Sequence, residues 1–215
     1  MSLLVLRRLS TVRKHVIARP GFRSFSSPAP SADATAYLNS SVTILPHYSK
    51  VEKGGEDGAE LRQSLIVIAD GVGGWSLSGV DPGIYARSLC RHVADFHEKG
   101  DRHYKIDPKQ LLVRAVEETR MEGSSTCVLA MLDPEKREYL HTANIGDSGY
   151  MLLRKNGLDL LKVFRSEELQ HSFNFPFQVG TGGDDPATAT VEVHEVKNND
   201  IIVMGTDGLW DNMYE

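Results

Sequence analysis

Carboxylates at the ends of two apolar runs are the residues of this chain best suited to chemistry. Each run ends in Asp-Gly and is followed by a tryptophan, in residues 66–75 and 201–211. A buried strand delivers such a carboxylate to its end, and the glycine permits a sharp turn there. Because a carboxylate in apolar surroundings is unfavourable unless it is paired or binds a metal, Asp70 and Asp207 predict a metal site built from oxygen ligands.

Further acidic residues lie in or near glycine-containing turns. They are Asp57, Asp147 and Asp211. Taken singly, each indicates only a turn, because an Asp side chain bonds to its own backbone there. Taken with the strand-end carboxylates, they form an oxygen-ligand set without a Cys or His cluster, which favours Mg²⁺ or Mn²⁺ over Zn²⁺. The sequence has no Gly-Lys dipeptide for a P-loop, and residues 71–76 do not complete a dinucleotide-binding fingerprint.

The elements that must position these residues are two helices and a series of strands. Asp-Pro pairs at 81–82 and 107–108 are helix start signals, and they predict helices that end near residues 99 and 122. The expected strands are 42–45, 65–69, 126–132, 138–143, 149–154, 159–164, 188–196 and 200–204. The last two strands are expected to form a hairpin. Helices among antiparallel strands predict an α+β layered domain.

Length and composition are those of one globular domain. Of the 215 residues, 40% are hydrophobic and 25% are charged. No apolar run approaches the roughly 18 residues that span a bilayer, so no membrane span is expected. The two cysteines, Cys90 and Cys127, are too few for a disulfide framework and are expected to be reduced core thiols.

The N-terminal segment differs from the rest in charge. Residues 1–32 contain six Lys or Arg residues, six serines and no Asp or Glu. This composition is typical of an organelle transit peptide, with an amphipathic helix over residues 3–18 and cleavage after Phe25. A disordered basic tail is the alternative interpretation. The expected organisation is a mitochondrial transit peptide (1–25), a linker (26–40) and a domain (41–215) in the mitochondrial matrix.

Removal of the expected transit peptide makes the chain strongly acidic. Six positive charges and no negative charge leave with residues 1–25, so the formal net charge changes from −5 to −11. This balance argues against nucleic acid or an anionic membrane as the main partner.

Six motifs occur in an order that resembles the metal-dependent type 2C serine/threonine protein phosphatases. The motifs are residues 55–57, 69–75, 123–126, 142–149, 173–178 and 206–212. The chain is most similar to the mitochondrial branch, which has Ala-Asp-Gly-Val-Gly-Gly-Trp where most members have Asp-Gly-His-Gly-Gly. The resemblance covers about residues 45–215. It implies an α/β/β/α sandwich of two antiparallel sheets flanked by helices, incomplete at the C-terminus.

The resemblance also implies a binuclear metal site. Two Mn²⁺ or Mg²⁺ ions share a water that attacks phosphorus in line with the leaving oxygen. Asp57 and Asp70 approach the metal pair, with Asp70 as the bridge, and Gly71 offers its backbone carbonyl. Asp207 holds the second metal.

A weaker third ion belongs to the implied site as well. Its ligands are Asp147 and Asp211, together with Asp207. Residues 123–126 are implied to be a turn into a core strand, with a structural rather than a catalytic role.

The sequence departs from the family pattern at three places. Val72 replaces the histidine that many members use as general acid, so leaving-group protonation falls to water or another group. The family's phosphate-binding arginine has no clear match, and Lys53 is the candidate near its place. The family continues beyond the position of Glu215 with further helices, strands and a last Asp-containing metal loop, so the resemblance predicts a C-terminally truncated domain.

Three functional hypotheses follow. The first is a monomeric serine/threonine phosphatase that acts on phosphoproteins. The second is a catalytically inactive, truncated phosphatase-like protein that binds metal or phosphoproteins without turnover. The third is a small-molecule phosphatase or nucleotide-binding protein, which the incomplete nucleotide motifs disfavour.

Overall fold

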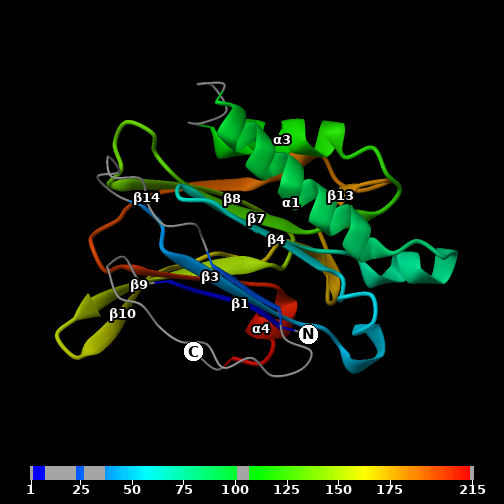
Figure 1. Cartoon of the computed structure of the whole chain (residues 1–215), viewed down its shortest axis with the longest axis horizontal. Helices are drawn as coiled ribbons and strands as arrows, with labels where there is room; N and C mark the ends of the chain where they lie inside the picture. The colour runs from blue at the N-terminus through cyan, green and yellow to red at the C-terminus, as the bar shows by residue number, and fades with distance from the viewer. Residues whose placement is uncertain (1, 8–22, 27–36, 101–106, 214–215) are drawn as a thin grey trace.

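Two antiparallel sheets stack face to face, and two helices cover one of them (Figure 1). The computed structural model describes residues 2–7, 23–26, 37–100 and 107–213, and for the first two stretches it describes the backbone alone. The covering helices are α1 (Pro82–Lys99) and α3 (Pro108–Glu118). Shorter helical turns are η1 (Tyr48–Lys50), η2 (Gly73–Ser78), η3 (Pro186–Thr188) and α4 (Asp207–Trp210).

The sheet under the helices has the strand order β14-β8-β7-β5-β4. Its strands are β4 (Asp57–Leu61), β5 (Leu65–Asp70), β7 (Cys127–Leu132), β8 (Tyr139–Ile145) and β14 (Thr190–Glu195). We call it the helix-side sheet. Every pairing within it is antiparallel, which agrees with the predicted α+β class.

The second sheet has the strand order β10-β9-β15-β1-β3-β2 and is also antiparallel. Its strands are β1 (Ser2–Arg7), β2 (Arg23–Ser26), β3 (Ser40–Leu45), β9 (Gly149–Asn156), β10 (Asp159–Arg165) and β15 (Ile201–Gly205). Two small ribbons join β6 (Ser124–Ser125) to β13 (Val179–Gly180), and β11 (Gln170–Ser172) to β12 (Phe175–Pro176).

The helix start signals act as predicted. The Asp81 side chain accepts a hydrogen bond from the Gly83 N–H at 3.0 Å, and Gly100 ends α1 in the left-handed conformation at φ 79°. In α3, the Asp107 carboxylate caps the first turn in the same way. This helix ends at Glu118, four residues before the predicted end, because Thr119 leaves the helical conformation.

Alternating side chains of β5 separate two hydrophobic cores. Leu65, Val67 and Ala69 point toward α1 and α3, and Ile66 and Ile68 point toward the second sheet. All five are fully buried. This strand is therefore buried on both faces, which is why it appears in the sequence as an unbroken apolar run.

A third, smaller cluster lies on the outer face of the second sheet. Met151 and Val203 of the sheet pack there against Leu209 and Trp210. Among the described residues, α4 is the helical element that represents the outer helix layer of the predicted α/β/β/α sandwich.

The predicted hairpin between the last two strands is wrong. Strand β14 pairs with β8 in the helix-side sheet, whereas β15 pairs with β9 and β1 in the second sheet. Asn199, at φ 70°, lies in the connection that crosses between the sheets. Polar residues joining two strands thus mark a turn, but they do not say whether the strands pair with each other.

Two further features of the structure differ from the sequence analysis. Strand β4 is absent from the expected strands. A helix was expected over residues 3–18, but Ser2–Arg7 forms strand β1 between β15 and β3. Residues 8–22 and most of the expected linker lie outside the described residues. In the described ranges, no helix has both the length and the apolar character needed to cross a membrane.

Candidate active site

The first Asp-Gly element places two carboxylates directly opposite each other. Strands β4 and β5 pair antiparallel with Asp57 opposite Asp70, so both side chains lie at the same end of the hairpin. Asp57 is fully buried, and neither of its carboxylate oxygens has a hydrogen-bond partner among the described residues. Like charges facing each other across a strand pair destabilise a sheet, and a buried carboxylate without partners adds to that cost.

Burial and mutual repulsion raise the pKa values of these carboxyl groups. The pKa of Asp57 rises to about 7, first because the group is desolvated and then because Asp207 is close. Burial, followed by the charges of Asp57 and Asp207, raises the pKa of Asp70 well above its usual range. Burial and the charge of Asp207 raise the pKa of Asp147 to about 6. A set of acids that oppose one another's ionisation is a site that a cation would stabilise.

The second Asp-Gly element brings its carboxylates to the same place from the other sheet. Strand β15 ends at Gly205, and the single turn of α4 begins with Asp207. The backbone N–H of Asp211 donates to the Asp207 carbonyl at 2.8 Å, which keeps both acids on one short turn. The Trp210 indole N–H donates to the Gly205 carbonyl at 2.8 Å and fixes this turn to the end of the strand.

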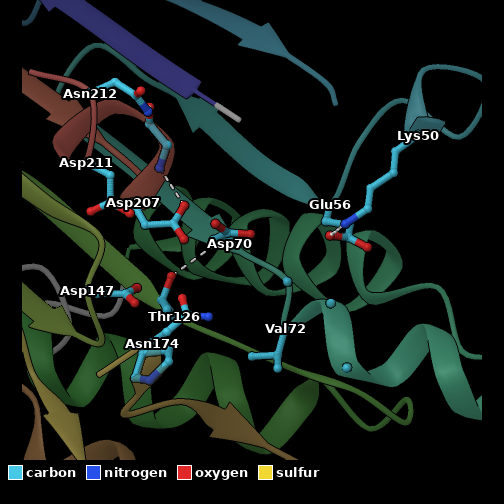
Figure 2. A pocket seen from close by; sticks show the side chains of 15 residues that line it. Lys50, Glu56, Asp70, Val72, Thr126, Asp147, Asn174, Asp207, Asp211 and Asn212 are labelled. Atoms are coloured by element: carbon cyan, nitrogen blue, oxygen red, sulfur yellow. Dashed lines mark hydrogen bonds and ion pairs between the residues drawn. The ribbon is translucent and has the colours of Figure 1, made fainter. Parts of the chain in front are cut away.

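These carboxylates surround one pocket of about 450 Å³ (Figure 2). Asp70, Asp147, Asp207 and Asp211 lie around one part of it, and the side chains of Lys50 and Glu56 lie across from them. The described residues that line it are Lys50, Glu56, Asp70, Gly71, Val72, Gly73, Gly74, Thr126, Asp147, Asn174, Pro176, Asp207, Gly208, Asp211 and Asn212. Five of the six predicted metal-site positions therefore line this pocket, and Asp57 lies opposite one of them on the neighbouring strand.

Gly71 is required by close backbone packing. A Cβ at this position would collide with the carbonyl oxygens of Pro82 and Glu56. Its own N–H donates to the Glu56 carbonyl at 3.1 Å. The glycine after Asp70 therefore lets three segments of backbone meet at the pocket.

Thr126 fixes the end of β5 through a hydrogen bond to the backbone of Asp70. The Asp70 N–H donates to the Thr126 hydroxyl at 3.1 Å, and this hydroxyl also lies 2.7 Å from the Ser148 hydroxyl. The predicted structural role of residues 123–126 is consistent with these contacts. Ser124 connects β6 to η2, because its hydroxyl accepts a hydrogen bond from the Trp75 indole N–H at 2.7 Å.

The predicted phosphate-contacting residue is not where it was expected. Lys53 is exposed and is absent from the described residues that line the pocket. The chain turns through η1 and the following residues, and this turn brings Lys50 into the pocket, where it forms an ion pair with Glu56. Sequence analysis missed Lys50, Glu56 and Asn174, because their positions depend on loop geometry and not on strand ends.

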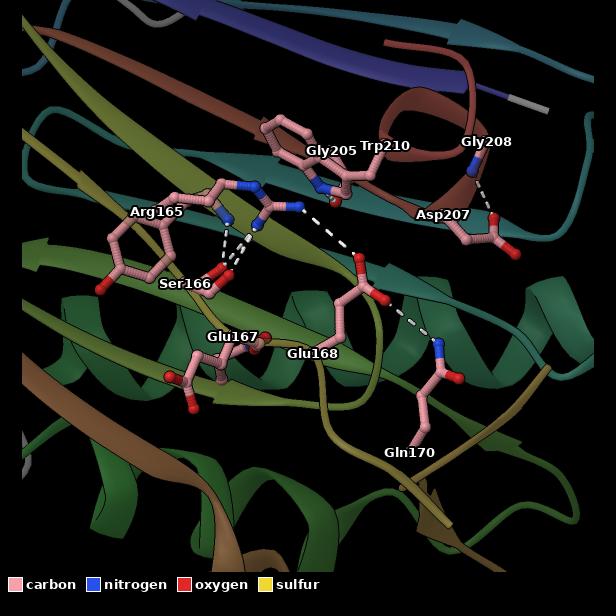
Figure 3. Close-up of polar contacts among 11 residues, drawn as sticks. Arg165, Ser166, Glu167, Glu168, Gln170, Gly205, Asp207, Gly208 and Trp210 are labelled. Carbon is pink, nitrogen blue, oxygen red and sulfur yellow. Dashed lines mark hydrogen bonds and ion pairs between the residues drawn. The ribbon is translucent and has the colours of Figure 1, made fainter. Parts of the chain in front are cut away.

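A stacked arginine supports the turn of α4 (Figure 3). The Arg165 guanidinium carbon lies 3.7 Å from the centre of the Trp210 ring. Its Nη1 donates to the carbonyl and hydroxyl of Ser166, each at 3.0 Å, and its Nη2 lies 3.8 Å from the Glu168 carboxylate. Arg165 thereby connects α4 to the segment that follows β10, and sequence analysis gave no sign of this contact.

The chemistry of the donor set fits a divalent cation. The acids supply hard oxygen donors, as Mg²⁺ and Mn²⁺ prefer, and the unpartnered oxygens of Asp57 are free to accept one. In the described part of the chain, no three His, Cys, Asp or Glu side chains already form a closed ligand group.

Comparison with known proteins agrees with this fold. Residues 62–215 match the family described as Stage II sporulation protein E (SpoIIE). Together with the two stacked sheets and the carboxylate pocket, this match defines the class, and the chain belongs to the SpoIIE family of PP2C-type serine/threonine phosphatase domains.

Curated relatives extend this finding. The chain is 37% identical over 188 residues to "Probable protein phosphatase 2C 71" of Oryza sativa subsp. japonica, covering 86% of the chain and 39% of the relative. It is also 37% identical over 181 residues to "Probable protein phosphatase 2C 80" of Arabidopsis thaliana, covering 82% of the chain and 42% of the relative. The chain thus spans about two fifths of the length of these relatives.

Solved structures share the fold. The X-ray structure of the photosystem II phosphatase PBCP aligns with a TM-score of 0.71 and 28% identity, covering 90% of this chain and 68% of that one. The catalytic domain of the serine/threonine phosphatase PstP, in complex with two manganese ions, aligns with a TM-score of 0.53 and 14% identity, covering 99% and 82%. The second likeness shows the fold alone.

Proposed function

We propose that this chain catalyses the hydrolysis of phosphoserine and phosphothreonine in proteins, and that this hydrolysis depends on divalent metal ions. The observation that supports it most is the convergence of Asp70 and Asp207 at one pocket, with Asp57 directly opposite Asp70 on the neighbouring strand. These carboxylates come from two strand ends in one sheet and from the turn after a strand in the other. Such rigid elements hold ligands accurately, which a metal-dependent hydrolase requires.

The proposed metal ligands follow the family pattern. Asp57, Asp70 and the Gly71 carbonyl, together with Asp207, would hold the metal pair. Asp147 and Asp211, with Asp207, would hold a weaker third ion. Bound Mn²⁺ or Mg²⁺ supplies Lewis-acid chemistry, by lowering the pKa of a coordinated water and withdrawing charge from phosphoryl oxygens.

The chain's own residues orient and neutralise the phosphate. Lys50 is a cation within the pocket, across from the carboxylates, and its ammonium group is suited to a phosphoryl oxygen. Glu56 pairs with Lys50 and so fixes the position of that charge. We assign to Lys50 the role that was expected for Lys53.

Val72 gives the pocket an apolar side chain where many family members have a histidine. None of the described residues that line the pocket is a histidine. We therefore propose that water protonates the leaving hydroxyl, and that the rate lacks the roughly 10²–10⁴-fold that a positioned general acid contributes.

Hydrolysis of a phosphothreonine peptide by the purified full chain in millimolar Mn²⁺ tests the proposal. We expect phosphate release that depends on Mn²⁺ and is abolished by Asp70→Asn, a change that removes the charge of a proposed metal ligand but keeps the side-chain shape. Asp159→Asn is the matched control, because Asp159 is exposed beside the turn between β9 and β10 and does not line the pocket. No turnover at millimolar Mn²⁺ would contradict catalysis by this chain and favour the inactive phosphatase-like alternative.

We also propose a mitochondrial location, on the composition of residues 1–25. These residues carry six positive charges and no negative charge. Fusion of residues 1–32 to a fluorescent reporter should direct the reporter to mitochondria, and replacing the six basic residues with Gln should abolish this. A reporter that stays dispersed would contradict the location without affecting the proposed activity.

A further inference from the structure

A fully exposed phenylalanine lies at the edge of the pocket. Strands β11 and β12 form a hairpin whose two-residue turn is Phe173–Asn174. The Phe173 side chain is 98% exposed, and Phe175, which follows the turn, is 51% exposed. Large aromatic side chains are usually buried, so a hairpin that presents two of them to solvent indicates a contact surface.

Asn174 ties this turn to the pocket. It has a left-handed backbone, with φ 55°, a conformation that Asn tolerates better than most residues. Asn174 and Pro176 both line the pocket, and the Asn174 side chain lies there beside Thr126 (Figure 2). The two phenylalanines directly precede and follow a residue that lines the pocket, so they border the space that the neighbours of a bound phosphoresidue must occupy.

The hairpin is held firmly enough to serve as a fixed contact. The His171 ring stacks on Phe177 with centroids 4.0 Å apart, and its Nε2 lies 2.9 Å from the Asp184 carboxylate. That carboxylate also accepts the Gln178 N–H at 2.9 Å. Phe177 packs against the core under the helices. Because the base is anchored in this way, exposure of Phe173 does not result from a loose hairpin.

The chemistry of the hairpin selects the kind of partner. Residues 172–178 (Ser-Phe-Asn-Phe-Pro-Phe-Gln) carry no charge, whereas the adjoining pocket is lined by carboxylates. The hairpin therefore offers apolar contact outside the pocket, and its residues 172–178 offer no charge for an ion pair with the substrate's flanking residues. Building on the proposed function, we propose that Phe173 and Phe175 are specificity-determining residues that bind a large apolar side chain next to the phosphoresidue of a protein substrate.

Phosphopeptide pairs that differ at one position test this inference. Phosphothreonine peptides carry Leu or Asp in turn at each of the three positions on either side of the phosphoresidue, and kcat/KM is measured with the full chain in Mn²⁺. We expect at least a tenfold preference for Leu at one or more positions. Phe173→Ser should remove most of this preference, while kcat/KM for p-nitrophenyl phosphate, which has no flanking residues, stays within twofold.

Leu158→Ser is the matched control. Leu158 is also fully exposed in the two-residue turn of a hairpin, between β9 and β10. It lies at the far end of β9 from Gly149, the residue that pairs with Gly205 near the pocket. This variant should keep the wild-type preference. A Leu preference that is absent from the wild type, or unchanged by Phe173→Ser, would overturn the inference even if the chain hydrolyses phosphopeptides.

A binding measurement separates the inference from the proposed function. Fluorescence anisotropy of labelled thiophosphorylated versions of the same peptides, which are hydrolysed slowly, gives their affinities directly. Tighter binding of the Leu peptides that is lost in Phe173→Ser, without hydrolysis of any phosphoester by the wild type, would support the hairpin contact and refute the proposed activity. Equal affinity for the Leu and Asp peptides would overturn the hairpin contact in either case.

Discussion

The guanidinium group of Arg165 stacks on the ring of Trp210, with 3.7 Å between the guanidinium carbon and the ring centre. Both side chains are largely buried, at 16% exposure for Arg165 and 8% for Trp210. A desolvated cation–π contact of this kind contributes roughly 2 kcal/mol. Since Trp210 lies on the same turn as Asp207, the contact connects the position of a proposed metal ligand to the end of strand β10.

Arg165→Met should weaken metal binding. The variant keeps an apolar side chain against Trp210 but loses the charge, so we expect a loss of about 1–2 kcal/mol in unfolding free energy. The Mn²⁺ concentration that gives half of the metal-induced rise in melting temperature should increase about tenfold. Arg154→Met is the control, because it breaks the ion pair with buried Asp200, destabilises the chain and should leave the Mn²⁺ midpoint unchanged. Equal midpoints for wild type and Arg165→Met would show that α4 keeps its position without the stack.

Acidification should stabilise the metal-free protein. The pKa of Asp57 is about 7 in the folded chain and about 4 in an unfolded one, so between these values the folded state binds more protons. Unfolding free energy should therefore rise as the pH falls from about 7 toward 4, and remain at its lower level above pH 7. The contribution of Asp57 alone to this gain has an upper limit of about 4 kcal/mol, because one pKa unit corresponds to about 1.4 kcal/mol.

Urea unfolding at pH 5 and pH 8 checks this pH dependence. Asp57→Asn should make the two midpoints more nearly equal, because it removes the group that titrates, and should raise the stability of the metal-free protein at pH 8. Asp70 keeps part of the dependence, since its pKa is raised by the same burial and by its neighbours. A wild-type protein that is more stable at pH 8 than at pH 5 without metal would contradict the repulsion described here.

Lys50→Met should lower kcat/KM for phosphopeptide hydrolysis, whereas Lys53→Met should not. A hydrogen bond to a charged group contributes about 1.5–3 kcal/mol, so loss of the Lys50 contact should lower kcat/KM by roughly 10- to 100-fold. Lys53 is three residues away and exposed, which makes it a matched control for charge. Equal kinetics for the two variants would refute the assignment of the phosphate contact to Lys50.

Both cysteines should be unreactive in the folded protein. Cys90 and Cys127 are free and fully buried, and burial raises the pKa of the Cys127 thiol to about 12 and that of Cys90 well above its usual range. Because the thiolate is the reactive form, Ellman's reagent should react with both thiols only after unfolding. Rapid reaction of one thiol in the native protein would contradict the described core packing.

Sequence patterns predicted the parts of this site that depend on strand ends. Asp70 and Asp207 each end an apolar run, and the structure brings both to one pocket. Contacts between distant segments could not be predicted in this way. Arg165 and Trp210 are far apart in the chain, and nothing in either local sequence indicates that they stack. The pairing of β14 was likewise missed, because pairing depends on which sheet a strand joins and not on the turn before it.

The positions of residues in loops were the other part of the site that could not be predicted from the sequence. The sequence indicated Lys53 as the phosphate-contacting cation, and only the path of the chain through η1 shows that Lys50 lies in the pocket instead. Asn174 lines the pocket from a turn in which its backbone is left-handed, and no periodicity in the sequence reveals that conformation.

The pairing of Asp57 with Asp70 has a consequence for how this domain tolerates changes in length. Side chains of a strand alternate between its faces, so one residue inserted or deleted within β4 or β5 would turn one carboxylate to the wrong side of the sheet. The connection at residues 62–64 lies at the other end of this hairpin. It could gain or lose residues without moving either acid. Natural or engineered variation in length is therefore expected to accumulate at that connection. The number of residues from Asp57 to Leu61, and from Ile66 to Asp70, should stay constant, because Leu61 and Ile66 form the pair next to the connection.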